Sequence, residues 1–508
     1  MKENKTICVT VTDAPYYAKG DGETNDRKAI QQAIDDVFAQ GGGIVELPAG
    51  KTFLSGGLIL RSNITLQFGE GTVLLQSSDP NDYVKPVEEG YESYKPAYGY
   101  NLEGGVKWAH IWYYNYPMLF AGEGTHDVKI AGKGTVRMMS GENPDKLLRI
   151  CPIGFYRVSR FEIADITITN YHTYGMMIFT CDHGLISNVT IGEWSYGNSD
   201  GVNLLNCQDI RVTGCHMNTC DDSLYIFSSY RDPRGGGWWS SDIPQPTRNI
   251  EIDHNDLASN HCKAFAMILW GLDCPDLEQV EVRNVYIHDN HFKSMGNWLY
   301  NPYTEKTGFP PVTNVRFENN RIDAIEQNFF DTAISDMNYF HSMTSMHNGD
   351  FEEGGLAFWS MRKNSNEDSV GVGRDAVGQD GAAYGYIAHL EEGDAAIYQG
   401  LYIKAGEPCN FGAKVQSSGN LCRMFVRDLE TQELVASKDF CNTQWKEEWL
   451  EFTVPKSGNY HIGIERGKAD SGWARIDNAM LLGNYEPAFG YSRVILDGKV
   501  IYIMEKDK

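Results

Sequence analysis

The fold is decided by a short motif that recurs between Asn63 and Asn314, an Asn or Asp followed by residues that alternate between apolar and polar. It is clearest in Asp165-Ile166-Thr167-Ile168 and, 23 residues later, in Asn188-Val189-Thr190-Ile191. Asp209-Ile210-Arg211-Val212 follows after a further 21 residues. The same motif begins at Asn63, Asp127, Asn249, Asn284 and Asn314. A repeat of this length, with strands and turns but no helical periodicity between them, predicts a β-solenoid whose short strands pair in parallel from coil to coil.

A helical pattern stands ahead of this repeat, after a Thr24-Asn25-Asp26 cap region. Apolar residues recur there at the spacing of one helix face, at Ile30, Ala33, Ile34, Val37 and Phe38. We expect this helix to cap the open end of the solenoid, which would otherwise expose apolar core and unpaired strand edges. A doubly wound α/β sheet is disfavoured, because no helical periodicity lies between the later strands.

Long gaps in the repeat indicate loops inserted on one side of the solenoid. The gap from Asp209 to Asn249 is 40 residues and contains a Gly-rich stretch with Trp238 and Trp239. Removing an excursion of about 19 residues restores one ordinary coil. The coil alignment then places this loop beside the acidic residues considered below.

The pattern of apolar and turn residues changes near residue 346. Short alternating runs separated by turn residues replace the coil motif, for example at 411–415 and 450–454. Strands of this kind, with turns about every 8–12 residues, predict an antiparallel β-sandwich. The expected fold class is all-β, with a parallel β-helix at 1–345, a sandwich at 346–484 and a hairpin or tail at 485–508.

The composition bounds the class of protein. A chain of 508 residues is longer than one core needs, which fits two ordered domains. Its net charge of −24 repels phosphate backbones and anionic lipid, so nucleic acid and membrane surfaces are poor partners. Eleven scattered cysteines fit reduced, buried thiols better than a disulfide framework. The start lacks an apolar signal segment, so the chain as written is expected to be cytoplasmic, or secreted if a signal peptide was removed.

Three aspartates carry the chemistry that the sequence indicates. Asp200, in Asn198-Ser199-Asp200-Gly201, precedes Asp221 by 21 residues and Asp222 by 22, which is one coil of the repeat. Equivalent positions on adjacent coils stack about 4.8 Å apart, so the three carboxylates converge on one patch. Like charges this close raise the pKa of at least one member, and an acid and a base can then coexist at neutral pH. Because neighbours in a regular strand face opposite ways, Asp221 and Asp222 can share the patch only if the backbone turns there.

His261 is a candidate fourth member of this patch. It lies 40 residues beyond Asp221, and removing the inserted loop of about 19 residues places it on the next coil. No metal or cofactor is expected. Cys215, Cys220 and Cys262 lack a paired Cys-x-x-Cys motif, and thiols stacked inside the solenoid are the simpler interpretation.

Residues 9–330 resemble the polygalacturonase (pectinase) family of inverting glycoside hydrolases, which are right-handed parallel β-helices. The resemblance is carried by the opening Ala18-Lys19-Gly20-Asp21-Gly22, by Asn198-Ser199-Asp200-Gly201, which is similar to the family's Asn-Thr-Asp-Gly, and by Asp221-Asp222. It implies that Asp221 is the general acid and that Asp200 and Asp222 activate water. A related dextranase and isopullulanase group carries a similar trio, and the second domain resembles carbohydrate-binding jelly rolls.

Two departures from the family bear on the substrate. The family's Gly-His-Gly is replaced by Asn260-His261-Cys262, and a two-residue shift would place Lys263 at the histidine position. Its Arg-Ile-Lys motif, which contacts a substrate carboxylate, should fall near Asn297-Trp298-Leu299-Tyr300, where no cation stands. Losing these cations removes charge-assisted contacts to a uronate, and Trp298 and Tyr300 offer stacking surfaces and a hydroxyl instead. Plain polygalacturonate is therefore a poor expected substrate.

The sequence predicts an inverting hydrolase of glycosidic bonds in a plant or microbial polysaccharide or oligosaccharide. The expected catalytic residues are Asp200, Asp221, Asp222 and His261, and the expected substrate-binding residues are Asn198, Trp238, Trp239, Lys263, Trp298 and Tyr300. Trp238 and Trp239 could stack on sugar faces or fold back over the solenoid. The rivals are a dextranase-like or isopullulanase-like α-glucanase, a polysaccharide lyase or epimerase, and a non-catalytic carbohydrate-binding solenoid. The residues give no indication of the oligomeric state.

Overall fold

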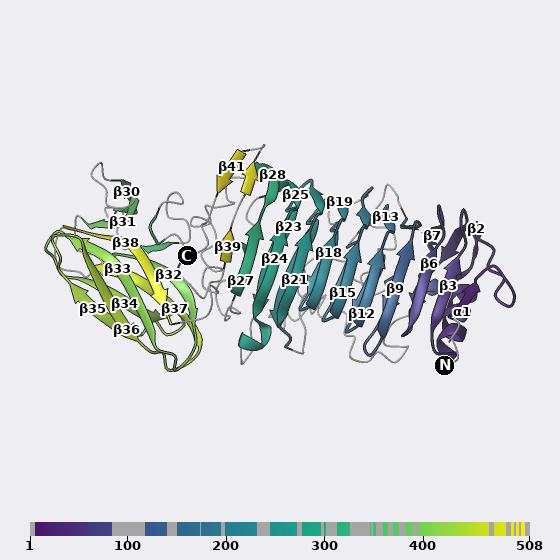
Figure 1. The fold of residues 1–508 in the computed structure, drawn as a ribbon, viewed down its shortest axis with the longest axis horizontal. Coiled ribbons are helices and arrows are strands. Elements are labelled where there is room, and N and C mark those ends of the chain that lie inside the picture. Colours follow the sequence, from purple (N-terminus) through teal and green to yellow (C-terminus); the bar gives the residue numbers. More distant parts are fainter. Residues whose placement is uncertain are drawn as a thin grey trace, which may run out of the picture.

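The computed structural model is a right-handed parallel β-helix followed by two antiparallel sheets, which confirms the predicted all-β fold (Figure 1). The strands of the β-helix lie side by side along its axis, and the antiparallel sheets stand at the end away from the N-terminus (Figure 1). The structure describes residues 6–83, 117–139, 150–172, 174–194, 199–230, 244–271, 277–295, 299–300, 312–325, 346, 349–351, 359–363, 369–374, 383–389, 395–466, 472–483, 489–491, 494–496 and 499–502.

Three sheets run along the β-helix, and their strands pair in parallel apart from the last two of the chain. The eleven-stranded sheet consists of β1 (Ile7–Thr10), β3 (Gly43–Leu47), β6 (Ile64–Phe68), β9 (His126–Gly132), β12 (Ser159–Ala164), β15 (Asp182–Ser187), β18 (Gln208–Thr213), β21 (Thr247–Asp253), β24 (Val282–His288), β27 (Val312–Glu318) and β39 (Phe489–Tyr491). The twelve-stranded sheet consists of β2 (Asp21–Asn25), β4 (Thr52–Ser55), β7 (Val73–Gln76), β10 (Thr135–Arg137), β13 (Thr167–Thr169), β16 (Thr190–Ile191), β19 (His216–Thr219), β22 (Asp256–Ser259), β25 (His291–Met295), β28 (Asn320–Ile325), β40 (Val494–Leu496) and β41 (Lys499–Tyr502). The eight-stranded sheet consists of β5 (Leu58–Ile59), β8 (Leu119–Ala121), β11 (Ile153–Tyr156), β14 (Met176–Phe179), β17 (Val202–Leu205), β20 (Leu224–Tyr230), β23 (Phe265–Gly271) and β26 (Leu299–Tyr300).

The Asn and Asp residues of the sequence motif hold the backbone in the left-handed region. All eight of them, from Asn63 (φ 60°) to Asn314 (φ 52°), have positive φ. Asn and Asp tolerate this conformation better than other residues that carry a side chain, which explains why they recur at the corners of the coils. Their side chains also form a ladder, in which Asn249 donates to Asp209 (2.8 Å) and Asn284 donates to Asn249 (3.0 Å).

The motif marks two different corners of the coil, so the spacing inferred from the sequence is correct for one step and wrong for the next. Asp165 and Asn188 follow directly on paired residues of β12 and β15 and are one coil apart. Asp209 lies at the other corner, where its neighbour on the preceding coil is His183 (φ 54°). The step from Asn188 to Asp209 is therefore not a coil. His183 and Arg160 (φ 52°) occupy that corner without the Asn or Asp signal, because the packing of neighbouring coils imposes the conformation on them.

Inward-facing apolar side chains fill the β-helix. In the eight-stranded sheet Met176, Val202, Leu224 and Phe265 stack in register and are fully buried. Burying a side chain of this size stabilises the fold by about 1.5–3 kcal/mol, before the entropy of ordering it is subtracted. The ten described cysteines are all free and seven of them are buried, which agrees with the expectation of reduced thiols.

Helix α1 (Arg27–Ala39) covers the N-terminal end of the β-helix, as predicted (Figure 1). Its buried residues are Ile30, Ala33, Ile34 and Val37. Phe38 was predicted on the same face but is 44% exposed, because it lies roughly 80° around the helix from Ile30, beyond the edge of the apolar stripe. In the predicted cap region, Asp26 makes no cap bond and accepts hydrogen bonds from the backbone amides of Lys19 (2.7 Å) and Gly20 (2.8 Å).

The other helical turns among the described residues are the 3-10 turns η1 (Pro80–Asp82) and η6 (Leu277–Val280). Within the described ranges, no helix has the length and apolar character needed to cross a membrane.

Two five-stranded antiparallel sheets follow the β-helix. One consists of β29 (Ser360–Arg362), β32 (Ala395–Ile403), β37 (Gly458–Arg466), β34 (Cys422–Asp428) and β35 (Leu434–Phe440), and the other of β30 (Ser369–Arg374), β31 (Ala383–His389), β38 (Gly472–Leu482), β33 (Cys409–Ser417) and β36 (Lys446–Phe452). The two sheets meet closely at Gly385 of β31, where a side chain would overlap Phe351 and Ile397 of β32.

The chain then returns to the β-helix, since β39 pairs in parallel with β27 and β40 with β28. The predicted domain boundaries at residues 345 and 484 stay predictions, because 326–345 and 484–488 lie outside the described residues.

Candidate active site

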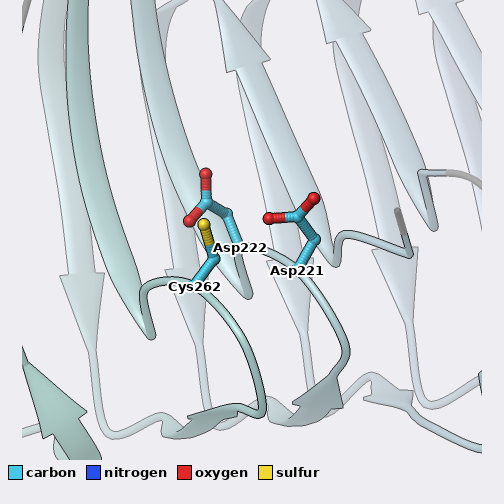
Figure 2. A group of neighbouring side chains, drawn as sticks. All are labelled: Asp221, Asp222 and Cys262. Carbon is cyan, nitrogen blue, oxygen red and sulfur yellow. The ribbon is translucent and has the colours of Figure 1, made fainter. Parts of the chain in front are cut away.

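The turn that joins β19 to β20 carries Asp221 and Asp222. Between Thr219, the last residue of β19, and Leu224, the first of β20, the chain leaves the strand conformation. The hydroxyl of Thr219 donates to the carbonyl oxygen of Asp221 (2.6 Å) and so closes the turn. The two aspartates therefore do not face opposite sides, and a carboxylate oxygen of each lies within 4.8 Å of the other (Figure 2).

Asp200 belongs to the preceding coil, at the position equivalent to Asp222. Val202 of β17 pairs with Leu224 of β20, and the ladder continues into the turn, where the amide of Gly201 donates to the carbonyl oxygen of Asp222 (2.9 Å). A side chain at Gly201 would overlap the backbone of the next coil, so only glycine fits there. Asp200 and Asp222 thus occupy equivalent positions on adjacent coils, one column of the solenoid, and Asp221 lies beside Asp222 in the turn.

The pKa of Asp222 is raised to about 6. Burial is the largest cause, because Asp222 is only 7% exposed and burial disfavours a charged carboxylate. The ammonium of Lys263 opposes the rise, whereas the charge of Asp221 adds to it. The backbone amide of Lys263, which donates to Oδ1 of Asp222 (2.9 Å), and the thiol of Cys262 also oppose it. Asp222 can therefore gain and lose a proton near neutral pH, which is what acid–base catalysis needs.

On the following coil, Cys262 and Lys263 lie against the carboxylates. The pairing of Leu224 with Phe265 of β23 extends back to place Lys263 opposite Asp222. The sulfur of Cys262 lies within 4.8 Å of an oxygen of both aspartates and points toward them (Figure 2). Of the two alternatives that the sequence left open for this coil, the register places Lys263 in the column.

His261 does not join this cluster of donor atoms. Its side chain is exposed, and its backbone amide donates to the carbonyl oxygen of Cys220 (2.9 Å). The reason is one extra residue in the turn between β22 and β23. Thr219 pairs with Ser259 and Leu224 with Phe265, so the turn after Ser259 is one residue longer than the turn after Thr219. A catalytic role for His261 stays a prediction that the cluster does not support.

Two buried tyrosines that the sequence did not single out, Tyr171 and Tyr225, lie near the carboxylates. The pKa of Tyr225, on β20, is raised well above its usual value, first by burial and then by the charge of Asp200, with Asp222 and Asp221 adding to it. The pKa of Tyr171 is raised by burial and then by Asp200. Both phenols therefore stay neutral at physiological pH. The signal that could have found Tyr225 is its position on the strand that leaves the Asp221-Asp222 turn.

Most of the predicted substrate-binding residues lie outside the described residues, namely Asn198, Trp238, Trp239 and Trp298. For Tyr300 only the backbone is described; it ends β26 and pairs with Ile268 of β23. The loop with the two tryptophans leaves β20 after Tyr230, whereas Asp222 precedes the start of that strand. The loop therefore begins roughly 20 Å from the carboxylates. Its expected position beside them stays a prediction.

Two groups among the described residues have donor atoms close enough together to hold a metal ion. These are Asp221, Asp222 and Cys262, and Glu251, Asp253 and His288. In the second group, the guanidinium of Arg211 already donates to both oxygens of Asp253 (2.9 Å each). In the first, the charge of Lys263 beside Asp222 opposes a second cation. Neither group therefore carries an argument for a metal beyond its spacing.

Two family models match parts of the β-helix. Residues 9–84 match the family described as rhamnogalacturonase A/epimerase, pectate lyase-like, and residues 112–349 match glycosyl hydrolases family 28. The second segment contains the whole Asp200, Asp221 and Asp222 trio.

Individual relatives cover part of the chain. A probable polygalacturonase of Vitis vinifera is 27% identical over 225 residues, which are 42% of this chain and 43% of the relative. An exo-poly-alpha-D-galacturonosidase of Dickeya chrysanthemi is 26% identical over 275 residues, 44% of either chain. The structure of a family 28 exopolygalacturonase from Yersinia enterocolitica has 19% identity and a TM-score of 0.45, and covers 63% of this chain and 61% of that chain. This chain spans less than half the length of the two curated relatives. Within residues 112–349 it contains a glycosyl hydrolase family 28 domain.

Proposed function

We propose that this chain is an inverting glycoside hydrolase that uses Asp200, Asp221 and Asp222 to cleave a galacturonan-type polysaccharide. The observation that carries the proposal is the close Asp221–Asp222 pair, in which burial raises the pKa of Asp222 to about 6. Hydrolysis of a glycoside needs one carboxyl that gives a proton and one carboxylate that accepts one. The family of residues 112–349 and the names of the relatives support a galacturonan-type chain.

The reaction adds water across the glycosidic bond. We assign the general acid to Asp221 because it matches the first Asp of the family's Asp-Asp motif; it donates a proton to the glycosidic oxygen as the bond from that oxygen to the anomeric carbon breaks. Asp222, with Asp200 on the preceding coil, accepts a proton from the water whose oxygen forms the new bond on the opposite face of the sugar. Exchange with solvent then returns a proton to Asp221 and removes one from Asp222.

The pH dependence of turnover separates the roles of the two neighbouring aspartates. As a base, Asp222 must be ionised, so kcat/KM should fall about tenfold per pH unit below about pH 6. Asp222→Asn should lose this acidic limb together with most of its activity. An alkaline limb at that pH in the wild type would exchange the roles, with Asp222 as the acid.

The proposed substrate is a galacturonan-type chain that presents no free carboxylate at the cleaved linkage, such as an esterified chain or one that alternates with neutral sugars. The absence of cations at 297–300 supports this choice. The backbone amide of Lys263 donates a hydrogen bond to Asp222, so this lysine lies at the site. Its ammonium is the nearby cation that could bind the carboxylate of a free uronate instead. Efficient hydrolysis of unesterified polygalacturonate that is abolished in Lys263→Ala would show that it does.

The experiment incubates the protein with a panel of glycans and measures the reducing ends that are released. Proton NMR then gives the anomeric configuration of the first product. The panel contains unesterified and esterified polygalacturonate, a galacturonan that alternates with a neutral sugar, and dextran. We expect cleavage of a galacturonan-type member with inversion at the anomeric carbon. Retention of configuration would contradict the mechanism, an unsaturated product would identify a lyase, and the absence of any product from folded protein would refute the proposed function.

A further inference from the structure

The thiol of Cys262 has different surroundings from the buried thiols of the β-helix. Cys151, Cys181 and Cys207 each donate to a backbone carbonyl oxygen two residues away, at 3.1 to 3.4 Å. The sulfur of Cys262 instead lies within 4.8 Å of a carboxylate oxygen of both Asp221 and Asp222 (Figure 2). A thiol in this place faces the two groups that the proposed reaction uses.

The backbone holds Cys262 in this orientation from both sides. Its own amide donates to the hydroxyl of Ser259 (2.9 Å). The next amide, of Lys263, donates to Oδ1 of Asp222 (2.9 Å), and the carbonyl oxygen of Lys263 accepts from the amide of Ser223 (2.9 Å). The turn is therefore tied to its own coil and to the preceding one, and the backbone of Cys262 is held beside the carboxylates.

The thiol keeps its proton at neutral pH. Burial raises the pKa of Cys262 well above its usual value, and the negative charges of Asp222 and Asp221 raise it further. A neutral thiol is a hydrogen-bond donor, and an ionised carboxylate only accepts. A hydrogen bond from the S–H group to Asp222 therefore favours the ionised form of that carboxylate.

We propose that Cys262 is a positioning residue of this site, whose thiol donates a hydrogen bond to the Asp221–Asp222 pair and favours the ionised form of Asp222. Asp222 is thereby kept ionised as the group that accepts a proton from water. The inference rests on the proposed function for its effect on turnover. The glycine of the Gly-His-Gly motif at this position would supply no such donor.

Other titratable groups also face the pair and are held constant in the test. They are Asp200 from the preceding coil, Cys220 and Tyr225 from the same coil, and Lys263 from the following coil. Substitution of Cys262 alone changes the donor without removing any of these charges.

The first test compares the acidic limb of kcat/KM in Cys262→Ala and Cys262→Ser. Alanine removes the donor, so the limb should move to higher pH by about 0.5–1 unit, whereas serine keeps a hydroxyl donor and should hold the limb near its wild-type position. Cys441→Ala is the matched control, because it changes an exposed cysteine that directly follows β35 of the antiparallel sheets. An acidic limb that does not move in Cys262→Ala would overturn the proposal.

The second test needs no glycan. Iodoacetamide alkylates a thiol by forming an S–C bond, with loss of iodide and release of the thiol proton to solvent. In Asp222→Asn the rate at Cys262, followed by mass spectrometry of its peptide, should rise about threefold to tenfold while the rate at Cys441 is unchanged, because one negative charge that suppresses the thiolate is gone. Equal rates at Cys262 in the variant and the wild type would overturn the coupling. If the rate at Cys262 rises as expected but no glycan is cleaved, the contact between Cys262 and Asp222 stands and the proposed hydrolase function is refuted.

Discussion

Two carboxylate clusters on the same β-helix are built from similar residues and behave in opposite ways. Asp222 lies in the turn before β20 and is 7% exposed, and Asp253 ends β21 and is fully buried. The pKa of Asp222 is raised to about 6. The pKa of Asp253 is held well below its usual range: burial alone would raise it, but hydrogen bonds from Arg211, His254 and Thr213 outweigh the burial.

The difference lies in how completely each carboxylate is satisfied. Asp253 has a guanidinium on both oxygens (2.9 Å each) together with a hydroxyl and an imidazole, so its charge stabilises the folded state. Asp222 has a backbone amide, a thiol and a like-charged neighbour, so burial costs it free energy. Burial by itself therefore does not identify a functional carboxylate. Burial without sufficient compensation leaves a proton that can move near neutral pH, and this is the property that the proposed reaction uses.

The largest expected contrast between the two clusters is in turnover. Asp221→Asn should lower kcat by about 10²–10⁴-fold, because it removes the proposed general acid without changing the shape of the turn. Glu251→Gln, the matched change in the other cluster, should leave kcat within about twofold. Both are measured on the best glycan of the panel, with circular dichroism to check the fold. Equal losses in the two variants would mean that the clusters do not differ in function.

Asp253→Asn should lower the free energy of unfolding by about 2–3 kcal/mol at pH 7, because a charge-assisted pair with Arg211 is lost in a buried place. The folded pKa lies below the unfolded one, so this stability is fully present above about pH 4 and is lost as the pH falls further. Urea unfolding of the variant and the wild type should therefore converge at low pH. A difference that does not depend on pH would assign the loss to packing rather than to charge.

Asp222→Asn should change the free energy of unfolding in the opposite direction, with a rise of about 1–2 kcal/mol at pH 7. The folded wild type binds the proton more tightly than the unfolded chain, so the wild type loses stability as the pH rises from about 4 to about 6. The neutral amide does not titrate, and the gain should vanish near pH 4. Unfolding curves across this range check the sign, and a variant less stable than the wild type at pH 7 would contradict the comparison.

The smallest expected effect is on stability in Glu251→Gln, below about 1 kcal/mol. Glu251 is 41% exposed on its side chain and lies 3.5 Å from Arg211, so solvent screens the pair. Added salt should reduce the small difference further. A loss as large as that of Asp253→Asn would show that the whole cluster acts as one unit.

Much of the β-helix could be predicted from local patterns. The left-handed corners select Asn and Asp, and Asn249, Asn284 and Asn314 follow that rule coil after coil. Corners that lack an Asn or Asp could not be predicted, because the rule recognises only these two residue types. His183 and Arg160 adopt the same conformation without the preferred side chain, so the sequence assigned the corner of their coils to Asp165 and Asn188 instead. At those positions the packing between coils overrides the local preference.

Residue type and spacing within one undisturbed coil were enough to predict the solenoid, its helical cap and the meeting of Asp200 with Asp221 and Asp222. Which residue of the next coil meets those carboxylates follows only from the three-dimensional register of the strands. The offset between paired strands changes by a single position across the turn, and such a slip exchanges the side chains that face a given place. That register is set by the hydrogen-bond ladder and by the core between coils, so Cys262 rather than His261 lies against the aspartates.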